Sequence, residues 1–331
     1  MRGEMSSALQ SNQSLRNSWL IAGMVMAVLT LLPFVLNQLG RTGEYWLWVA
    51  TEMVIMSLFS LSLNLILGFG GMVSFGHAAF FGVGAYTVAL LMKKAGVGFV
   101  PAMVAAPLAS AFVAGIIGWF CVRRVGLYFS ILTLAFGQLI FMITLQLYAF
   151  TGGDDGIHGI PRPEMLTPLS YYLVCLALVA GSFWLMRFLT RSPFGLTIRM
   201  TRENPERAKF LGINVKRYQL INFIIAGGFA GLAGGLFTEL NRFAQTEFLH
   251  WSKSAEPIFA SLVGGMYSLI GPAIGSTVLI FLKIIIQQIH QGLVEIWGII
   301  LGVILLGVVL FTPEGIMGVY EKIRAQRRRP Q

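Results

Sequence analysis

This sequence contains few charged residues. Only 11% of its 331 residues are Asp, Glu, Lys or Arg, whereas 56% are hydrophobic and the mean hydropathy is +0.74. Soluble domains carry about a quarter charged residues. The composition therefore excludes an ordinary soluble domain and predicts an integral membrane protein with several helical spans.

Cysteine, histidine and nucleotide-binding motifs are equally scarce. Cys121 and Cys175 each lie within an apolar stretch, so neither a disulfide framework nor a thiolate metal site is indicated. Four scattered histidines and the absence of H-E-x-x-H argue against a zinc site. No G-x-x-x-x-G-K-[ST] phosphate loop occurs, so this chain does not hydrolyse ATP by that route. We expect no cofactor, no metal and no enzymatic activity.

The formal net charge of +10 does not indicate a nucleic-acid partner. The basic residues lie in loops and in the tail, without the interleaved aromatic residues of a nucleic-acid-binding patch. The polar N-terminal segment 1–17 is too long for the charged part of a signal peptide, and no small-residue cleavage site follows it. We therefore expect the first span to be retained.

The apolar stretches predict an all-α polytopic bundle over residues 18–311, because a bilayer core of ~30 Å takes about 20 residues per helix. Clear spans are expected at 18–36, 46–67, 99–121, 127–150, 169–189, 218–240, 272–289 and 293–311. Segments 73–92 and 255–271 are Gly-rich or short, and they either cross or re-enter the membrane. If both cross, there are about ten crossings, with a basic tail at 312–331.

The distribution of Lys and Arg supports ten crossings. It places seventeen basic residues on one side and six on the other, which predicts that both termini are cytoplasmic. The long outer loop at 151–168 is rich in Gly, Pro and Asp, so we expect a structured turn that is available to an external partner.

The long inner loop at 190–217 contains the segment "RENPERAKFLGI". Asn204 is a good N-cap, Pro205 suits the first helical position and Glu206 suits the positive helix end. Gly212 is placed to end the helix. This short basic helix is either a docking element or part of an ordinary solvated loop.

Ionisable groups inside the spans are few and therefore informative. Glu52 and Glu239 lie near span ends, where the favoured interpretation is that they reach toward the interface. Lys283 is deeper, and Gln287 lies one turn further along, which predicts a polar stripe facing protein or water. Too few acidic residues line the spans for a proton relay, which disfavours an ion-coupled secondary transporter.

The segment "GFGGMVSFGHAAFFGVGAY" at 68–86 combines six glycines with Ser74 and His77. It is either a tightly packed helix, with His77 bonded to a neighbouring backbone group, or a broken crossing beside a transport path. "GGMVS" at 70–74 is echoed by "GGMYS" at 264–268, and paired interrupted segments point to a central pathway. An intramembrane hydrolase is disfavoured, because no G-x-S-x-G surrounds Ser74 and no third orienting group is apparent.

Six blocks in order resemble the permease subunits of branched-chain amino-acid ABC importers, from about residue 46 to 318. They are "GGMVSFGHAAFFGVGAYTVALL", "GLYFSILTLAFGQ" with "TGGDDGIHGIPRP", "SPFGLTIRMTRENPERAKFLGINVKRYQL", "FIIAGGFAGLAGGLF", "LVGGMYSLIGPAIGS" and "FTPEGIMGVYEK". The second block is more similar to the LivM type than to the smaller LivH type.

The resemblance implies a subunit of the bacterial inner membrane that works with a LivH-type permease, two ATP-binding subunits and an external binding protein. The family's coupling helix, E-A-A-x-x-x-G, matches Glu206, Ala208 and Gly212, with Arg207 in place of the first alanine. The substrate would be leucine, isoleucine or valine, with urea, short amides and other amino acids as alternatives. Small or polar groups flanking the interrupted spans are expected to line the path: Asn64, Ser74, His77, Tyr128 and Gln138.

Overall fold

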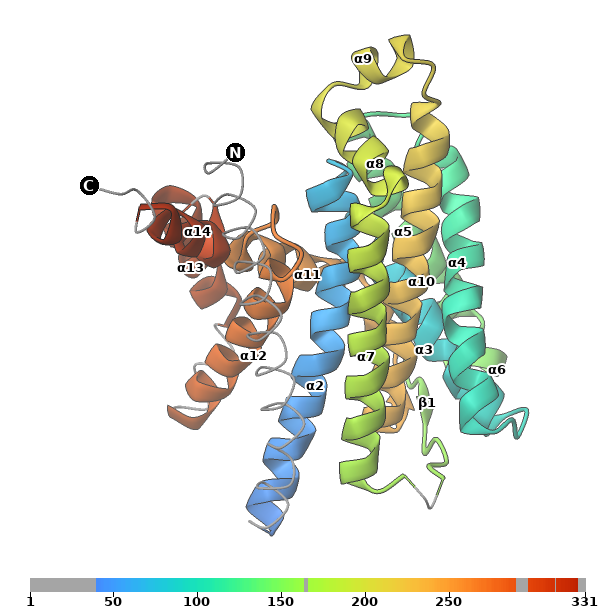
Figure 1. The fold of residues 1–331 in the computed structure, drawn as a ribbon. Coiled ribbons are helices and arrows are strands. Elements are labelled where there is room, and N and C mark those ends of the chain that lie inside the picture. The colour runs from blue at the N-terminus through green and yellow to red at the C-terminus, as the bar shows by residue number, and fades with distance from the viewer. Residues whose placement is uncertain (1–39, 164–165, 290–296, 313, 327–331) are drawn as a thin grey trace, which may run out of the picture. The chain divides into compact units, whose positions relative to one another are not determined.

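A computed structural model describes residues 40–163, 166–289, 297–312 and 314–326 of the chain (Figure 1). In chain order the elements are α2 (Arg41–Asn64), η1 (Leu65–Phe69), α3 (His77–Lys93), α4 (Phe99–Cys121), α5 (Leu127–Gln146), α6 (Tyr148–Thr151), β1 (Ile157–His158), α7 (Pro168–Arg191), α8 (Pro193–Glu203), α9 (Pro205–Phe210), α10 (Val215–Asn241), β2 (Phe243–Ala244), η2 (Thr246–Leu249), α11 (Trp251–Gly264), α12 (Gly271–Ile289), α13 (Trp297–Phe311) and α14 (Gly315–Gln326).

The contacts divide the chain into two units. One comprises residues 1–51 and 164–177, and the other comprises 52–163 and 178–331. The first unit contributes the start of α2 and the start of α7, where Tyr171 and Tyr172 are fully buried. The second unit holds all the other described elements and every candidate site residue.

The helical, multi-pass class predicted from composition is confirmed. Within the described ranges, six helices are long and apolar enough to cross a membrane, and two shorter apolar helices accompany them. The six are Thr42–Phe69, Phe99–Cys121, Leu127–Gln146, Pro168–Arg191, Val215–Asn241 and Gly271–Gln288, and the shorter two are His77–Lys93 and Trp297–Val308. The expected first span at 18–36 lies outside the described residues, so the number ten stays a prediction.

The first weak crossing is a break followed by a helix. α2 runs into a π-helical turn, η1, and residues 70–76 that follow contain no regular helix. Gly71 has φ +68°, a left-handed conformation that glycine adopts at little cost. α3 then begins at His77 and is 17 residues long. The interruption predicted at 68–86 is therefore present, and π turns of this kind occur often at functional sites.

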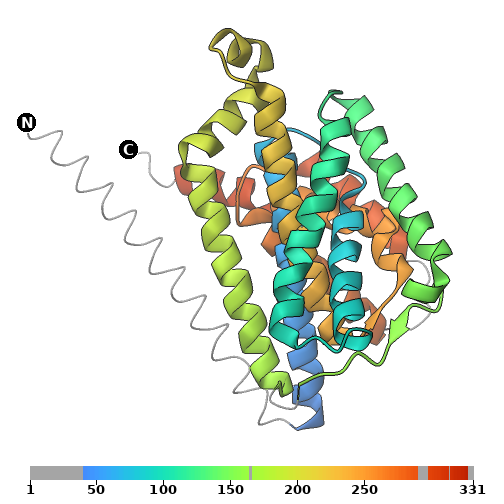
Figure 2. The same ribbon diagram turned by 90° about the vertical axis from the view of Figure 1, so that its right-hand side faces the viewer.

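Helices α3, α4 and α10 pack together closely, side by side in Figure 2. A Cβ added to Gly84 would lie 2.0 Å from the carbonyl oxygen of Gly231, and one added to Gly234 would lie 1.8 Å from that of Phe81. Between α4 and α10, a Cβ on Gly227 would lie 2.4 Å from the Cβ of Ala114. Small residues let helix backbones approach, and close van der Waals packing holds membrane helices together.

The second weak crossing is one arm of a helical hairpin. α11 ends at Gly264 and α12 begins at Gly271, so the tip at 265–270 interrupts the segment expected at 255–271. The arms meet through glycine, because a Cβ on Gly275 would lie 2.0 Å from the carbonyl oxygen of Ala260. Ala260, Val263 and Leu279 form a buried cluster between the arms, and α13 residues pack on it.

The loop at 151–163 is fastened to the end of α10. β1 pairs antiparallel with β2, and the backbone N–H of Ile160 donates to the carbonyl of Arg242 at 3.3 Å. Arg162 Nε donates to Glu239 Oε1 at 3.1 Å, and its Nη2 donates to the Glu239 carbonyl at 2.9 Å. The Glu239 side chain is 0% exposed, so it is covered by protein, and its position relative to the membrane interface stays a prediction. Its carboxylate stays inside because an arginine is brought to it.

Candidate functional site

The two glycine-rich breaks meet each other. We define the first break as residues 65–76 and the second break as residues 264–270. A Cβ on Gly68 would lie 2.0 Å from the carbonyl oxygen of Met266. Asn64, the residue before the first break, donates from Nδ2 to the carbonyl of Ser268 at 3.1 Å. The two segments that echo each other in sequence are therefore neighbours in space.

The π turn of the first break is held from α10. A π turn shifts the backbone hydrogen-bond pattern by one residue, which frees a carbonyl for another donor. Asn222 Nδ2 donates to the carbonyl of Leu65 at 2.7 Å, and Asn222 is only 4% exposed. Asn222 was not among the residues predicted from the sequence. Its only signal is one amide among the apolar residues of "LINFIIAGG".

His77, at the start of α3, is completely buried among aromatic rings and α2. Its ring stacks on Phe59, with centroids 5.6 Å apart, and meets Phe80 edge-on. Its Nε2 lies 2.9 Å from Ser62 Oγ, so its partner is a side chain and not the backbone group that one of the two alternatives assigned to it. Ser62 donates its single hydroxyl hydrogen to the carbonyl of Phe59 at 2.6 Å. In a neutral ring the proton therefore resides on Nε2, and Nδ1 is an acceptor.

Four of the five predicted path residues share one property. Each holds a buried side-chain atom that has no hydrogen-bond partner among the described residues: Asn64 Oδ1, Ser74 Oγ, His77 Nδ1 and Gln138 Nε2. Only three other described side chains, Tyr86, Thr238 and Glu239, carry such an atom. Buried polar groups are nearly always paired, so each of these exceptions asks for an explanation.

Tyr128 does not share that property. It lies at the start of α5 and its side chain is 75% exposed, whereas Asn64, Ser74 and His77 are 0% exposed. The sequence placed Tyr128 with the others because it is polar and near a span end. The fold turns Tyr128 outward, whereas Asn64, Ser74 and His77 lie inside the chain. Its place on the path stays a prediction.

The loop at 190–217 contains two consecutive capped helices. Ser192 caps α8 by accepting from the Gly195 N–H. Asn204 caps α9, with its Oδ1 accepting from the Arg207 N–H at 2.9 Å, and Pro205 takes the first helical position. The helix expected after Asn204 is therefore present. Only one residue separates α9 from α8, a helix that we did not predict.

α9 ends where Gly212 was expected to end it. Gly212 has φ +79°, its N–H donates to the Lys209 carbonyl at 2.9 Å, and the Ile213 N–H donates to the Ala208 carbonyl at 3.1 Å. This pair of bonds is a Schellman motif, which satisfies the last carbonyls of a helix and requires a left-handed residue. The short helix is thus closed at both ends by its own residues.

The side chains of α9 divide into a buried anchor and an exposed outer surface. Ala208 is 1% exposed, whereas Phe210 is 90% exposed. Glu206 forms an exposed ion pair with Lys209 at 3.0 Å. An exposed aromatic residue on a rigid, charged helix is typical of a surface that binds another protein.

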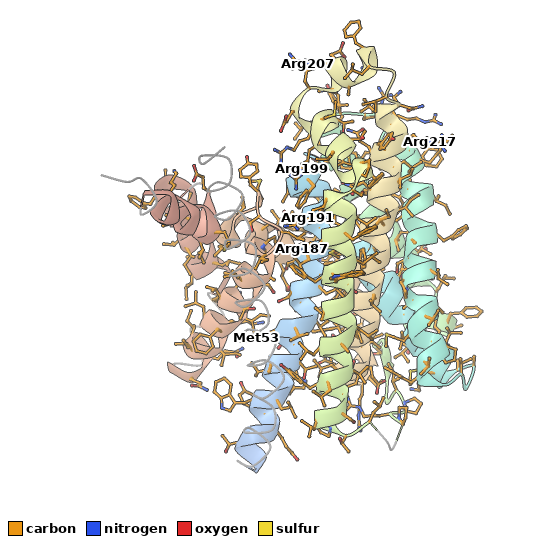
Figure 3. All side chains as sticks on the ribbon, viewed as in Figure 1. Met53, Arg187, Arg191, Arg199, Arg207 and Arg217 are labelled. Atoms are coloured by element: carbon orange, nitrogen blue, oxygen red, sulfur yellow. The ribbon has the colours of Figure 1, made fainter. Side chains whose placement is uncertain are left out.

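Arginines gather at this end of the second unit. Figure 3 shows Arg187, Arg191, Arg199, Arg207 and Arg217 along the end of α7, α8, α9 and the start of α10. At the other end of α10, Lys93 donates to the His158 carbonyl and Tyr148 donates to Asp155 at 2.8 Å. That hydrogen bond, followed by the Asp155 charge, raises the pKa of Tyr148.

These features define the class of protein. The chain is a multi-pass helical membrane protein with glycine-broken helices that meet beneath an exposed helical loop, an arrangement that resembles those of transport proteins. The family model described as "Branched-chain amino acid transport system / permease component" matches residues 45–309. The chain therefore belongs to this family of ABC transporter permeases, which are transport proteins rather than enzymes, and within it to the LivM type.

Individual relatives agree with this placement. The chain is 28% identical over 327 residues to the high-affinity branched-chain amino acid transport system permease protein LivM of Escherichia coli, covering 90% of this chain and 74% of the relative. It is 28% identical to LivM of Salmonella typhimurium, covering 81% and 69%. It is 31% identical to the guanosine ABC transporter permease protein NupQ of Bacillus subtilis, covering 35% and 36%. No solved structure matches the chain.

Proposed function

We propose that this chain forms the translocation path of an ATP-driven importer together with a second permease of the LivH type. Two ATP-binding subunits would drive it, and an external binding protein would deliver the substrate. The observation that carries the proposal beyond its family is α9, a helix capped at both ends that exposes Phe210. A closed helix transmits a push as a rigid body, which is what coupling to a moving ATPase requires.

We propose branched-chain amino acids as the substrate. The support is the printed function of the LivM relatives from Escherichia coli and Salmonella typhimurium, which cover most of this chain. Relatives that match shorter parts are named for guanosine and for autoinducer 2. A permease of this architecture therefore serves more than one substrate class, and urea, short amides and other amino acids are the competitors to test.

Along the path, we propose that Asn64, Ser74, His77 and Gln138 present hydrogen-bonding atoms to water or to the passing substrate. Each already holds a buried polar atom that has no hydrogen-bond partner within the part of the chain that the structure describes. The carboxylate and ammonium groups of an amino acid must lose water inside the membrane, and such atoms replace part of its hydration.

The central experiment reconstitutes the chain with its partners in proteoliposomes and measures uptake of labelled leucine. We expect uptake only with ATP and the binding protein present. A secondary transporter would instead take up substrate alone under an ion gradient. An excess of unlabelled isoleucine or valine should compete, whereas competition by urea or short amides alone would reject the proposed substrate.

Two substitutions test the role of α9. Glu206→Lys reverses an exposed charge beside Phe210, and Gly212→Pro is incompatible with φ +79° and removes the bond to Lys209. Both should abolish ATP-driven uptake while the chain still inserts. Glu203→Lys is the matched control, because it reverses an exposed charge on α8. Undiminished uptake in both α9 variants would reject the coupling assignment.

A further inference from the structure

One side chain of the inner loop contacts both glycine-rich breaks. Arg202, in the last turn of α8, donates from Nη1 to the carbonyl of Gly68. Its guanidinium carbon lies 5.3 Å from the ring centroid of Tyr267, in the second break. A Cβ on Gly71 would lie 2.4 Å from Arg202 Cγ, so the aliphatic part of the arginine lies against the first break.

The carbonyl of Gly68 is available because the helix ends there. The backbone bonds of this turn run from Gly71 N–H to the Leu67 carbonyl and from Met72 N–H to the Ile66 carbonyl. The carbonyl of Gly68 is left to the guanidinium, as the last carbonyls of a helix require an external donor. Gly71 lacks a side chain, and this lets the arginine stem reach that carbonyl.

We propose that Arg202 is the positioning residue that connects the coupling helix to the transport path, by holding the two breaks against each other. This inference rests on the proposed function and names the element through which it acts. Asn204, the cap of α9, is two residues from Arg202, so a displacement of α9 reaches Arg202 through one short link. Withdrawal of the guanidinium from Gly68 and Tyr267 releases the contact between the breaks.

Arginine suits this position better than lysine. A planar guanidinium can donate in its plane to a carbonyl while its face covers an aromatic ring, whereas an ammonium is a point charge on a flexible stem. Arg199, one turn earlier on α8, lies 4.8 Å from the ring centroid of Phe69 and so contacts the first break alone. Among the contacts of the described residues, Arg202 is the arginine that bridges both breaks.

The test measures uptake and ATP hydrolysis separately in the assembled, reconstituted complex. Arg202→Met keeps the aliphatic contact with Gly71 but removes the donor and the charge, and Arg202→Lys keeps the charge. Tyr267→Leu removes the ring, whereas Tyr267→Phe retains it. Arg217→Met is the matched control, because Arg217 is an exposed arginine at the start of α10 (Figure 3).

We expect Arg202→Met to lower uptake by at least about tenfold, within the usual range of coupling between sites, while ATP hydrolysis stays within about twofold. Arg202→Lys should be intermediate, Tyr267→Leu should be impaired, and Tyr267→Phe and Arg217→Met should behave as wild type. The double variant Arg202→Met/Tyr267→Leu should be no worse than Arg202→Met alone, because both substitutions break the same link.

Three results would overturn the inference. One is wild-type uptake in Arg202→Met. Another is an equal loss of uptake and ATP hydrolysis with a lowered melting temperature, which would make Arg202 merely structural. The third is additivity in the double variant. If Arg202→Met does not assemble, Tyr267→Leu is measured instead. Loss of uptake with ATP hydrolysis retained would support the inference, and wild-type uptake or an equal loss of both would overturn it. A wild-type complex without ATP-driven uptake would instead reject the proposed function itself, which separates the two failures.

Discussion

The packed helices α3, α4 and α10 and the two breaks use glycine for opposite purposes. In the packed helices, Gly84 and Gly234 keep helical conformations, and each lies where a Cβ would strike a neighbouring backbone carbonyl. In the breaks, Gly71 and Gly265 have φ +68° and +104°, and helical structure stops beside them. The same residue therefore makes one region rigid and interrupts the other. What differs is the backbone conformation, which is helical at Gly84 and Gly234 and left-handed or extended with positive φ at Gly71 and Gly265. At Gly71 the nearest atom also belongs to a side chain able to move, that of Arg202.

The largest effect should come from filling the packed helices. Gly234→Leu places a side chain 1.8 Å from the Phe81 carbonyl, and a backbone cannot rotate away. We expect destabilisation beyond the ~1–3 kcal/mol usual for overpacking, and no folded protein after detergent extraction. Size-exclusion chromatography and thermal unfolding measure this. Gly181→Leu is the control, because a Cβ at Gly181 meets no atom within 4 Å. If both variants eluted and melted like the wild type, close backbone packing would not be the reason for glycine at position 234.

The next largest effect tests how far the rigid region extends toward the loop at 151–163. Arg162→Met leaves the fully buried Glu239 carboxylate without its arginine, and breaking a buried pair this way costs about 3–5 kcal/mol. We expect a lower melting temperature and faster proteolysis within 151–163. Glu239→Gln should be milder, because the amide oxygen and the backbone carbonyl still accept from Arg162. If proteolysis of the loop in Arg162→Met were as slow as in the wild type, the β1–β2 pairing would be sufficient to hold the loop in place.

An identical substitution in the two regions sharpens the comparison directly. Gly71→Ala forces a left-handed conformation on alanine at a cost of about 1–2 kcal/mol and presses on the Arg202 stem, which can shift. Gly84→Ala places the same methyl 2.0 Å from a fixed carbonyl of Gly231. We expect Gly84→Ala to lower the melting temperature more, and Gly71→Ala to lower uptake more at equal amounts of folded protein. The reverse order in paired melting and uptake measurements would contradict this.

The smallest effect on stability should come from α9. Lys209→Ala removes an exposed ion pair with Glu206, and pairs of this kind contribute about 0–1 kcal/mol. We expect an unchanged melting temperature for the purified chain. Binding of the ATPase subunits, measured by co-purification, should weaken if the charge of α9 contributes to docking. A large drop in melting temperature would instead place α9 within the folded core.

Local features of this protein were predictable from sequence where the cause lies within a few residues. The caps of α9 at Asn204 and Gly212 follow from side-chain and backbone preferences over about eight positions, and both form as expected. The interruption after η1 was visible because glycines cluster there. Orientation in the membrane and the tenth crossing stay predictions.

Partners that are distant in the sequence were not predictable. Arg162 finds Glu239, Asn222 finds Leu65 and Arg202 finds Gly68, across 77, 157 and 134 residues. Neither the Arg162 partner of Glu239 nor the Ser62 partner of His77 was indicated by the sequence. The sequence also does not say which face of α5 turns outward, so the exposure of Tyr128 was not predictable.

The sequence by itself determined three things. The protein crosses a membrane through several helices, glycines interrupt the chain near two of them, and a short capped helix follows Asn204. These properties depend on hydrophobicity and backbone preference, which each residue carries with it. Only the tertiary structure decided that the two breaks meet, that an arginine of α8 touches both, and that four predicted path residues each hold a buried polar atom without a hydrogen-bond partner among the described residues. Those outcomes depend on which helices are neighbours, and this is determined by packing between residues that are distant in the sequence.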